Sequence, residues 1–151
     1  MASSGTPSGA SQSGAICGHW LRVGQKLRFD RAPRVFQVNW FRKGADGRFL
    51  WPGFGDNSRV IDWIVRRING EVGAVESPIG RLPVTADLDL TGIDVPQSDL
   101  DELFAIDPVS WLREADLTED FYNTFDGRVP AALHSELAAL RYRLKSAPQP
   151  A

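Results

Sequence analysis

The chain has 151 residues, of which 42% are hydrophobic and 24% are charged, and its formal net charge at pH 7 is -2. Its length suits one domain, and its composition is ordinary for a soluble globular protein. The near-neutral charge excludes an overall positive field for nucleic acid or an anionic membrane, and no apolar run reaches the roughly 18 residues of a membrane span.

The first residues differ from the rest in composition. Residues 1–15 are rich in Ser, Gly, Ala and Thr and carry no charged side chain, so they cannot form a core and are expected to be disordered. They lack the basic and apolar regions of a secretory signal, and the single cysteine, Cys17, excludes an internal disulfide. We therefore expect a cytoplasmic protein with a disordered leader over residues 1–17, a folded part over residues 18–146 and a tail over residues 147–151.

A hairpin is the first element predicted after residue 18. Residues 35–41 combine β-branched and aromatic residues with polar residues at 37 and 39, which is typical of a strand. Residues 44–47 read Gly-Ala-Asp-Gly and predict a turn, and residues 48–51 predict a short returning strand. Because two strands alone are marginal in water, this hairpin is a small core for the helices that follow.

Two helices are predicted in the middle of the chain. Asn57 or Ser58 can cap a helix over residues 57–68, which Gly70 ends. The loop-rich passage that follows contains a short segment, residues 78–83, that is expected to be extended. Ser98 with Asp101 then resembles a capping box for a short helix that ends at residue 104.

Two further helices are predicted toward the end of the chain. An acidic cap followed by proline, Asp107-Pro108, predicts a helix that reaches about residue 125 and is closed by Asp126-Gly127. Pro130 opens the last helix, in which leucines at 133, 137, 140 and 144 form an apolar stripe. We expect this stripe to pack in the core, which is commoner than a seam for a partner helix.

The densest chemical signal lies in residues 40–59, which hold three phenylalanines, two tryptophans and four basic residues. Phe41 and Phe49 lie on opposite arms of the predicted hairpin and Phe54 on the loop beyond, so three rings could enclose one gap. A base stacked on aromatic rings gains about 1–3 kcal/mol, and free N–H groups at residues 55–57, before the helix, could read its edge. The alternative is that these aromatic rings form part of the core, which is the commoner use of such a cluster.

Two long motifs and several short ones give this chain a resemblance to a known family. The long motifs are Val38-Asn39-Trp40-Phe41-Arg42-Lys43 and Gly47-Arg48-Phe49-Leu50-Trp51-Pro52-Gly53-Phe54-Gly55-Asp56-Asn57-Ser58-Arg59-Val60. The short ones are Asp62-Trp63, Pro78-Ile79-Gly80, Leu88-Asp89-Leu90 and Asp101-Glu102-Leu103-Phe104. In this order they resemble the C-terminal part of GTP-dependent phosphoenolpyruvate carboxykinase, over about residues 18–146.

The resemblance implies a fold and a set of nucleotide-binding residues. The implied fold class is α/β in the mixed α+β sense: a partial C-terminal lobe of the carboxykinase fold, with a small hairpin or sheet packed by about four helices. By this resemblance three rings enclose guanine and the run that follows contacts the nucleotide. These residues are Phe41, Phe49, Phe54, Gly55, Asp56 and Asn57. Asp56 departs from the family pattern, in which glutamate is more frequent.

The resemblance also implies a reaction. The family is a decarboxylating lyase of gluconeogenesis, in which oxaloacetate is decarboxylated to an enolate that GTP phosphorylates, with manganese or magnesium as cofactor. The chain contains no Gly-x4-Gly-Lys-Ser/Thr phosphate loop, and none of its residues matches the family's metal ligands, reactive cysteine or oxaloacetate-binding arginines. We therefore expect no catalytic residue, no metal ligand and no turnover by this chain alone. The expected partners are a small-molecule nucleotide and a missing N-terminal catalytic part, without nucleic acid or membrane.

A non-catalytic nucleotide- or single-strand-binding module is the alternative function. It would use four basic residues around the aromatic rings, namely Arg34, Arg42, Lys43 and Arg48. The acidic net charge counts against it. A third hypothesis is a truncated gene product that folds poorly and aggregates through an exposed sheet edge.

Overall fold

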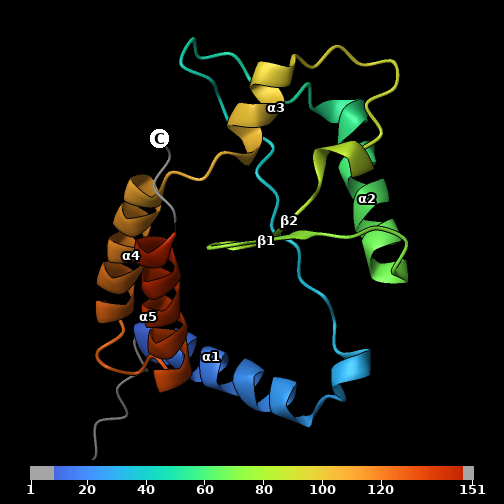
Figure 1. Cartoon of the computed structure of the whole chain (residues 1–151). Helices are drawn as coiled ribbons and strands as arrows, with labels where there is room; N and C mark the ends of the chain where they lie inside the picture. Colours follow the sequence, from blue (N-terminus) through green and yellow to red (C-terminus); the bar gives the residue numbers. More distant parts are fainter. Residues whose placement is uncertain (1–8, 148–151) are drawn as a thin grey trace, which may run out of the picture. The chain divides into compact units, whose positions relative to one another are not determined.

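The computed structural model describes residues 9–147, which form two compact units (Figure 1). One unit combines residues 9–33 with residues 107–147, and the other comprises residues 34–106. Within the predicted leader and tail, residues 1–8 and 148–151 lie outside the described residues. The first helix, α1 (Gly9–Lys26), begins inside the segment whose composition predicts disorder, so the expected start of the fold at residue 18 falls within a helix. The division into leader, folded part and tail stays a prediction.

The unit of residues 9–33 and 107–147 is helical in its described part. Its helices α4 (Pro108–Asn123) and α5 (Ala131–Ser146) lie side by side, as Figure 1 shows. The buried residues are Pro108 and Ala115 in α4, and Leu137 and Leu144 in α5. The predicted packing of the leucine stripe into the core is therefore confirmed for Leu137 and Leu144, whereas Leu133 and Leu140 are half-buried.

The caps predicted for these two helices are also present. The Asp107 carboxylate accepts hydrogen bonds from the backbone N–H groups of Val109 and Ser110, both at 3.1 Å, and proline occupies the first helical position. Such a cap satisfies donors that have no partner within the helix. Pro130 stands at the N-cap of α5. Helix α4 ends at residue 123, two residues earlier than predicted, and the chain turns through residues 124–127.

The unit of residues 34–106 contains α2 (Asn57–Asn69), α3 (Gln97–Phe104) and a two-stranded antiparallel sheet. The strands β1 (Val75–Ser77) and β2 (Gly80–Leu82) pair with Glu76 opposite Arg81. Gly70 ends α2 with φ 80°, the left-handed conformation that glycine adopts without strain, as predicted. Residues 78–83 are expected to be extended, and residues 80–82 of that segment form β2.

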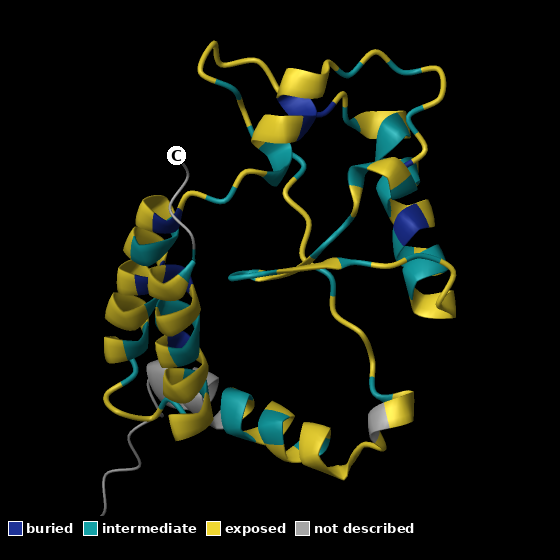
Figure 2. Cartoon of the chain, viewed as in Figure 1, coloured by how far each residue is buried: buried dark blue, intermediate teal, exposed yellow. Residues whose placement is uncertain are grey.

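The core of this unit is small and gathers residues from three elements. Its buried hydrophobic side chains are Leu50, Trp51, Trp63, Leu88 and Leu100 (Figure 2). The Phe36 ring meets the Trp63 ring edge-on, with 6.3 Å between the ring centroids. Apart from Leu88, the buried side chains thus come from the segment before α2, from α2 itself and from α3.

The prediction of a two-stranded hairpin over residues 35–51 is wrong. Residues 33–39 have no regular secondary structure, and the paired backbone is reduced to one bridge between Lys43 and Phe49. Val35 is 92% exposed and Val38 is 36% exposed, so neither β-branched residue of this stretch is buried in the core. A strand is stabilised by packing against neighbours more than by its own propensity, which explains the difference. The sheet of this unit lies instead at residues 75–82.

Two predicted helix caps are wrong as well. Asn57 and Ser58 are the first residues of α2, the N-cap is Asp56 without a side-chain cap, and a 3-10 helix (Phe54–Asp56) precedes it directly. Pro96 stands at the N-cap of α3, so Ser98 is inside the helix rather than before it. A proline that fixes an extended backbone there starts the helix two residues earlier than the capping-box pattern predicts.

The predicted fold class is confirmed, because helices combine with a small antiparallel sheet. Over residues 9–147 the structure contains five α-helices. Among these helices none is at once long enough and apolar enough to cross a bilayer.

Candidate functional site

A tight loop brings Phe41 and Phe49 together. Within this loop, residues 41–50 (the aromatic loop), Gly44 N–H donates to the Arg48 carbonyl at 2.9 Å and Leu50 N–H to the Arg42 carbonyl at 3.0 Å. The two rings meet at an angle of 62°, with 6.3 Å between their centroids. The ring of Phe41 is 74% exposed and that of Phe49 is 46% exposed. The loop therefore presents an aromatic pair at the surface.

The aromatic loop is bound to α3 by two arginines. The Arg48 guanidinium donates to both carboxylate oxygens of Asp99, at 2.7 and 3.2 Å. Arg42 Nη1 donates to the carbonyls of Leu103 and Ala105, at 2.9 and 3.3 Å, where α3 ends. The hydrogen bond from Arg48 lowers the pKa of Asp99, which is itself buried. The same bond raises the pKa of Arg48.

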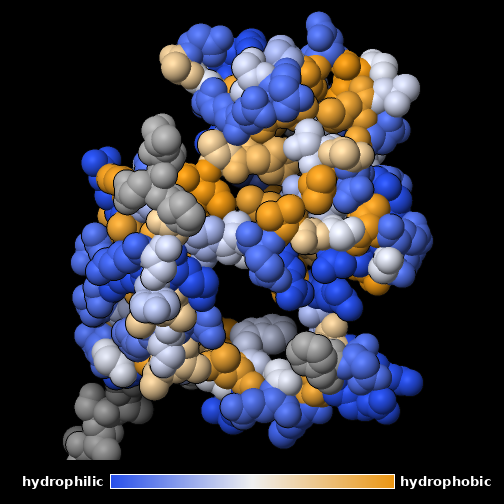
Figure 3. Space-filling view, viewed as in Figure 1, coloured by the Kyte–Doolittle hydropathy of each residue, from blue (hydrophilic) through white to orange (hydrophobic). Residues whose placement is uncertain are grey.

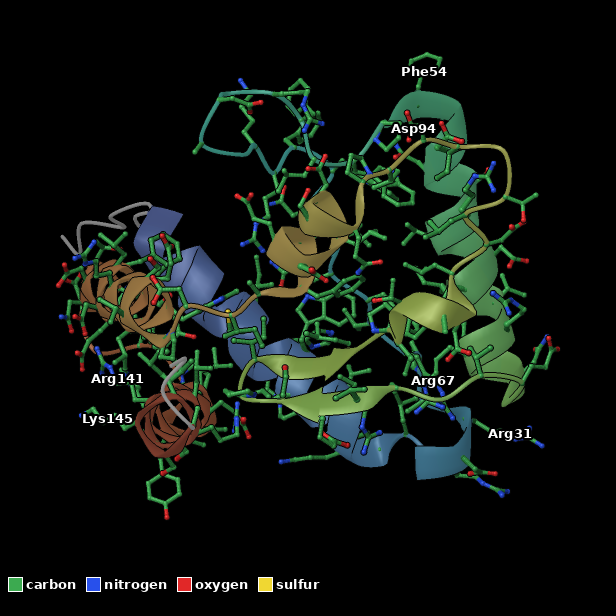
Figure 4. The ribbon with its side chains drawn as sticks, turned by 45° about the horizontal axis from the view of Figure 1, so that its top comes forward. Arg31, Phe54, Arg67, Asp94, Arg141 and Lys145 are labelled. Carbon is green, nitrogen blue, oxygen red and sulfur yellow. The ribbon has the colours of Figure 1, made fainter. Side chains whose placement is uncertain are left out.

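Phe54 stands apart from this pair. Its side chain is 99% exposed and projects outward from the turn before α2 (Figure 4). Its backbone has φ 49°, and Gly53 before it has φ 76° and ψ -167°. A non-glycine residue in the left-handed region is uncommon and concentrates at functional turns. Surface hydrophobic side chains of this unit are visible in Figure 3.

The backbone N–H groups beside Phe54 are less available than the sequence predicts. Asp56 N–H donates to the Gly53 carbonyl at 3.1 Å, and Asn57 N–H donates to the carbonyls of Phe54 and Gly55. The expectation that these N–H groups point freely at a ligand is therefore wrong for Asp56 and Asn57, because a 3-10 turn binds them first. Asn57 still offers its amide, whose Oδ1 accepts from Trp51 Nε1 at 3.2 Å.

The residues after Phe54 line an open depression of about 490 Å³ at the start of α2. Its lining is Gly55, Asp56, Ser58, Arg59, Asp62 and Asp89. Arg59 is the central group: its Nε donates to Asp56 Oδ1 at 3.1 Å and its Nη1 to the Asp89 carbonyl at 2.8 Å. A hydrogen bond from Thr91 N–H lowers the pKa of Asp89. The depression is polar, so it suits hydroxyl or amide groups of a ligand better than an apolar surface.

The predicted site residues thus fall into two groups. The structure brings Phe41 and Phe49 together on the aromatic loop, and it places Phe54 with Gly55, Asp56 and Asn57 at the start of α2. The enclosure of a base by all three rings stays a prediction. Sequence reasoning missed that Arg42 and Arg48 bind α3, and that Arg59 lies in the depression. The alternation of Phe and Arg along residues 41–49 is the signal that could have indicated the first.

The described residues do not fit a divalent metal ion. Over residues 9–147, no three side chains of His, Cys, Asp or Glu gather in a group that could hold one. His19 lies edge-on to Trp20, and His134 edge-on to Tyr122 with 5.3 Å between the ring centroids.

Comparison with known proteins agrees with the resemblance. Residues 6–143 match the family described as phosphoenolpyruvate carboxykinase C-terminal P-loop domain. The phosphoenolpyruvate carboxykinase (GTP) of Neocallimastix frontalis is 44% identical over 135 residues, which are 89% of this chain and 22% of that protein. The proteins of the same name from Corynebacterium glutamicum and Paenarthrobacter aurescens are 42% and 41% identical, over 89% and 87% of this chain and 22% of each relative.

The chain belongs to the family of the phosphoenolpyruvate carboxykinase C-terminal domain, because the match covers residues 6–143. The recognition from the motifs is confirmed, and the match begins twelve residues earlier than the motifs indicated. The chain spans about 22% of the length of these relatives, so it corresponds to one part of such an enzyme. The alternative of a single-strand-binding module gains no support. Two of its basic residues, Arg42 and Arg48, are bound to α3.

Proposed function

We propose that this chain forms the guanine-binding part of a GTP-dependent phosphoenolpyruvate carboxykinase. In this proposal GTP is the nucleotide, and Phe41, Phe49 and Phe54 stack on its base. The complete reaction is the decarboxylation of oxaloacetate and phosphorylation of the resulting enolate to phosphoenolpyruvate, with manganese or magnesium. It requires residues that this chain does not contain. A cytoplasmic location accompanies the proposal.

The exposure of the three phenylalanines carries the proposal. Leu50 and Trp51, which lie between Phe49 and Phe54 in the sequence, are buried, with exposed fractions of 3% and 6%. Phe41, Phe49 and Phe54 are 74%, 46% and 99% exposed. A segment that buries two large side chains and exposes three rings is not packing all its aromatic residues into a core. Exposed aromatic rings offer the surface on which a base stacks, and the polar depression lined by the residues after Phe54 suits the hydroxyl groups of a sugar.

Binding is expected to be specific for the base and weak in absolute terms. Stacking contributes about 1–3 kcal/mol per base, whereas the phosphate loop that would hold the triphosphate is absent from this sequence. Millimolar ligand is therefore the appropriate upper range of a titration. Discrimination between guanine and adenine would come from polar groups such as the Asn57 amide, because unpaired polar groups penalise the wrong base.

Tryptophan fluorescence tests the proposal directly. Trp51 donates to Asn57, so a change at the candidate site reaches a buried fluorophore. GTP should change the emission of the folded chain saturably, and ATP at the same concentration should change it less. The Trp51→Phe variant should lose the signal, although calorimetry should still detect the heat of GTP binding. A folded chain without any GTP response up to millimolar concentration would contradict the proposal.

Turnover is tested separately from binding. We expect no formation of phosphoenolpyruvate when the purified 151-residue chain is incubated with GTP, oxaloacetate and Mn²⁺. Phosphoryl transfer depends on positioning and on neutralising phosphate charge, for which this chain supplies neither a phosphate loop nor, within residues 9–147, a metal site. Measurable turnover by the chain alone would refute this part of the proposal.

A further inference from the structure

Each ring of the aromatic pair has an arginine as its neighbour in the chain. Phe41 is followed by Arg42, and Phe49 is preceded by Arg48. Both arginines contact α3, whereas both rings remain at the surface. One side of the loop therefore holds to α3 and the other side faces the solvent.

Arg48 makes the more specific of the two contacts. Its planar guanidinium meets the Asp99 carboxylate through two nitrogens, a geometry that fixes orientation as well as distance. The same Nη1 lies 3.4 Å from the carbonyl oxygen of Phe49. Asp46 also faces Arg48, with 3.6 Å between Oδ2 and Nε. Arg48 thus links α3 to the peptide that carries the Phe49 ring.

Arg42 fixes the other arm of the loop. Its guanidinium donates to two carbonyls at the C-terminal end of α3, Leu103 and Ala105. The last carbonyls of a helix lack partners within it and carry partial negative charge, so a cation is favourable there. The two arginines therefore hold both arms of the loop to the two ends of one helix, because Asp99 lies in the first turn of α3.

The turn between the arms is closely packed. A β-carbon placed on Gly44 would lie 3.1 Å from Leu50 Cδ2 and 3.3 Å from Asp46 Oδ1. Lys43 Nζ lies 4.9 Å from the centroid of the Phe49 ring. Because Leu50 at the end of the loop is also buried, the loop has little freedom to turn its rings away.

We propose that Arg42, Arg48 and Asp99 are positioning residues, which hold the aromatic loop against α3 and so keep the Phe41 and Phe49 rings in the orientation that accepts guanine. This inference rests on the proposed function for the identity of the ligand. The orientation of the rings themselves is independent of any ligand. Preorganised rings lose less conformational entropy on binding, so their fixation raises affinity without adding a contact to the base.

The test compares two variants with one matched control. Arg48→Lys keeps the positive charge but cannot form the bidentate hydrogen bonds to Asp99. Asp99→Asn removes the carboxylate charge with little change of shape. The control is Arg81→Lys, the same substitution in the exposed ion pair of Arg81 with Glu76 on the sheet of the same unit. All three are made in the full 151-residue chain labelled with 4-fluorophenylalanine.

Fluorine NMR of the chain without ligand gives a separate resonance for each labelled phenylalanine ring. Resonances are assigned with Phe→Leu variants, and Phe36 serves as the internal reference because its ring packs against Trp63. We expect the Phe49 and Phe41 resonances to shift and broaden in Arg48→Lys and Asp99→Asn, while the Phe36 resonance and the far-UV circular dichroism stay unchanged. Arg81→Lys should change none of them. GTP binding should weaken about fivefold or more in the two variants, since part of one stacked ring is lost.

Two results would overturn the inference. One is that the Phe41 and Phe49 resonances of both variants match those of the unchanged chain. The other is that the Phe36 resonance collapses together with them, because then the ion pair only holds the whole unit folded. If the ring resonances respond as expected but the unchanged chain binds no GTP, the positioning of the rings stands and the proposed function fails.

Discussion

The aromatic loop and the turn of Phe54 present phenylalanine rings in opposite ways. Phe41 and Phe49 contact one another, and their loop is bound to α3 at two points. Phe54 is 99% exposed and stands on a backbone with positive φ after a glycine with positive φ. Side-chain contacts hold Phe41 and Phe49 in place before any ligand binds, so these two rings are called the prepared pair. The position of the Phe54 ring is set by backbone geometry instead. A base that binds here would find two rings in place and a third whose position depends on a strained turn.

Truncation of a ring in the prepared pair should have the largest effect on binding. Phe49→Ala removes a stacking partner, so GTP affinity should fall by about 1–3 kcal/mol. The free energy of unfolding should change less, because the ring is 46% exposed. The control is Phe121→Ala in α4, an exposed ring with its own edge-on partner, Phe125. Calorimetric titration measures the affinities, and equal loss in both variants would contradict stacking at Phe49.

The turn of Phe54 should be sensitive to its glycine rather than to a contact. Gly53 has φ 76° and ψ -167°, a region open almost only to glycine, and a β-carbon there would meet nothing within 4 Å. Gly53→Ala should therefore cost about 1–3 kcal/mol in conformational strain alone. Gly55→Ala is the matched substitution: its backbone φ is not positive and its β-carbon site is also empty, so stability should stay nearly unchanged. Urea unfolding compares the two.

Removal of the third ring should change stability and binding in opposite directions. Phe54→Gly relieves the left-handed strain, about 1–2 kcal/mol, and adds the entropic cost of glycine, about 0.5–1 kcal/mol. The net stabilisation should be about 0.5 kcal/mol, with weaker GTP binding. No comparable gain is expected for the prepared pair. Stabilisation without any loss of GTP affinity would show that Phe54 does not contact the base.

Helices α2 to α5 could be predicted because their signals are local, whereas α1 was not predicted, since its first residues have the composition of a disordered segment. Asp107-Pro108 fixes the start of α4 through contacts within four residues, and Gly70 ends α2 through its own φ. The strand at residues 35–41 could not be predicted reliably, because a strand needs a partner and an apolar surface that propensity does not reveal. In the short sheet at residues 75–82, the extended backbone of β2 was expected, but β1 and its pairing with β2 were missed for the same reason.

The sequence predicted which residues belong to the candidate site, but it did not predict how they contact one another or the rest of the unit. The motif from Phe41 to Asn57 gave the family and the six candidate residues, but their contacts depend on α3, which begins about forty residues after Asn57. Only the fold shows that Arg48 meets Asp99 across fifty-one positions. The N–H groups at residues 56 and 57 were expected to be free, and the 3-10 turn that binds them is a local detail that the sequence pattern does not fix.

Acid should release the aromatic loop while leaving the turn of Phe54 unaffected, and this is the smallest expected effect. The Arg48 hydrogen bond lowers the pKa of Asp99 in the folded chain. The stabilisation from this pair is therefore complete above the ordinary pKa of aspartate, and it is lost as the pH falls through the lowered pKa. Fluorine spectra between pH 6 and the acid limit of folding should show the Phe49 resonance moving in this low range, before or with unfolding.

Asp99→Asn is the control that assigns this acid transition. The variant should already show the shifted Phe49 resonance at neutral pH and no further movement in the acid range, because residue 99 no longer titrates. Asp46 also faces Arg48, at 3.6 Å, so Asp46→Asn should leave most of the transition in place. If the Phe49 resonance of Asp99→Asn still moves with the same midpoint, another carboxylate holds the loop. If the Phe54 resonance moves together with that of Phe49, the two regions do not differ in the way their contacts indicate.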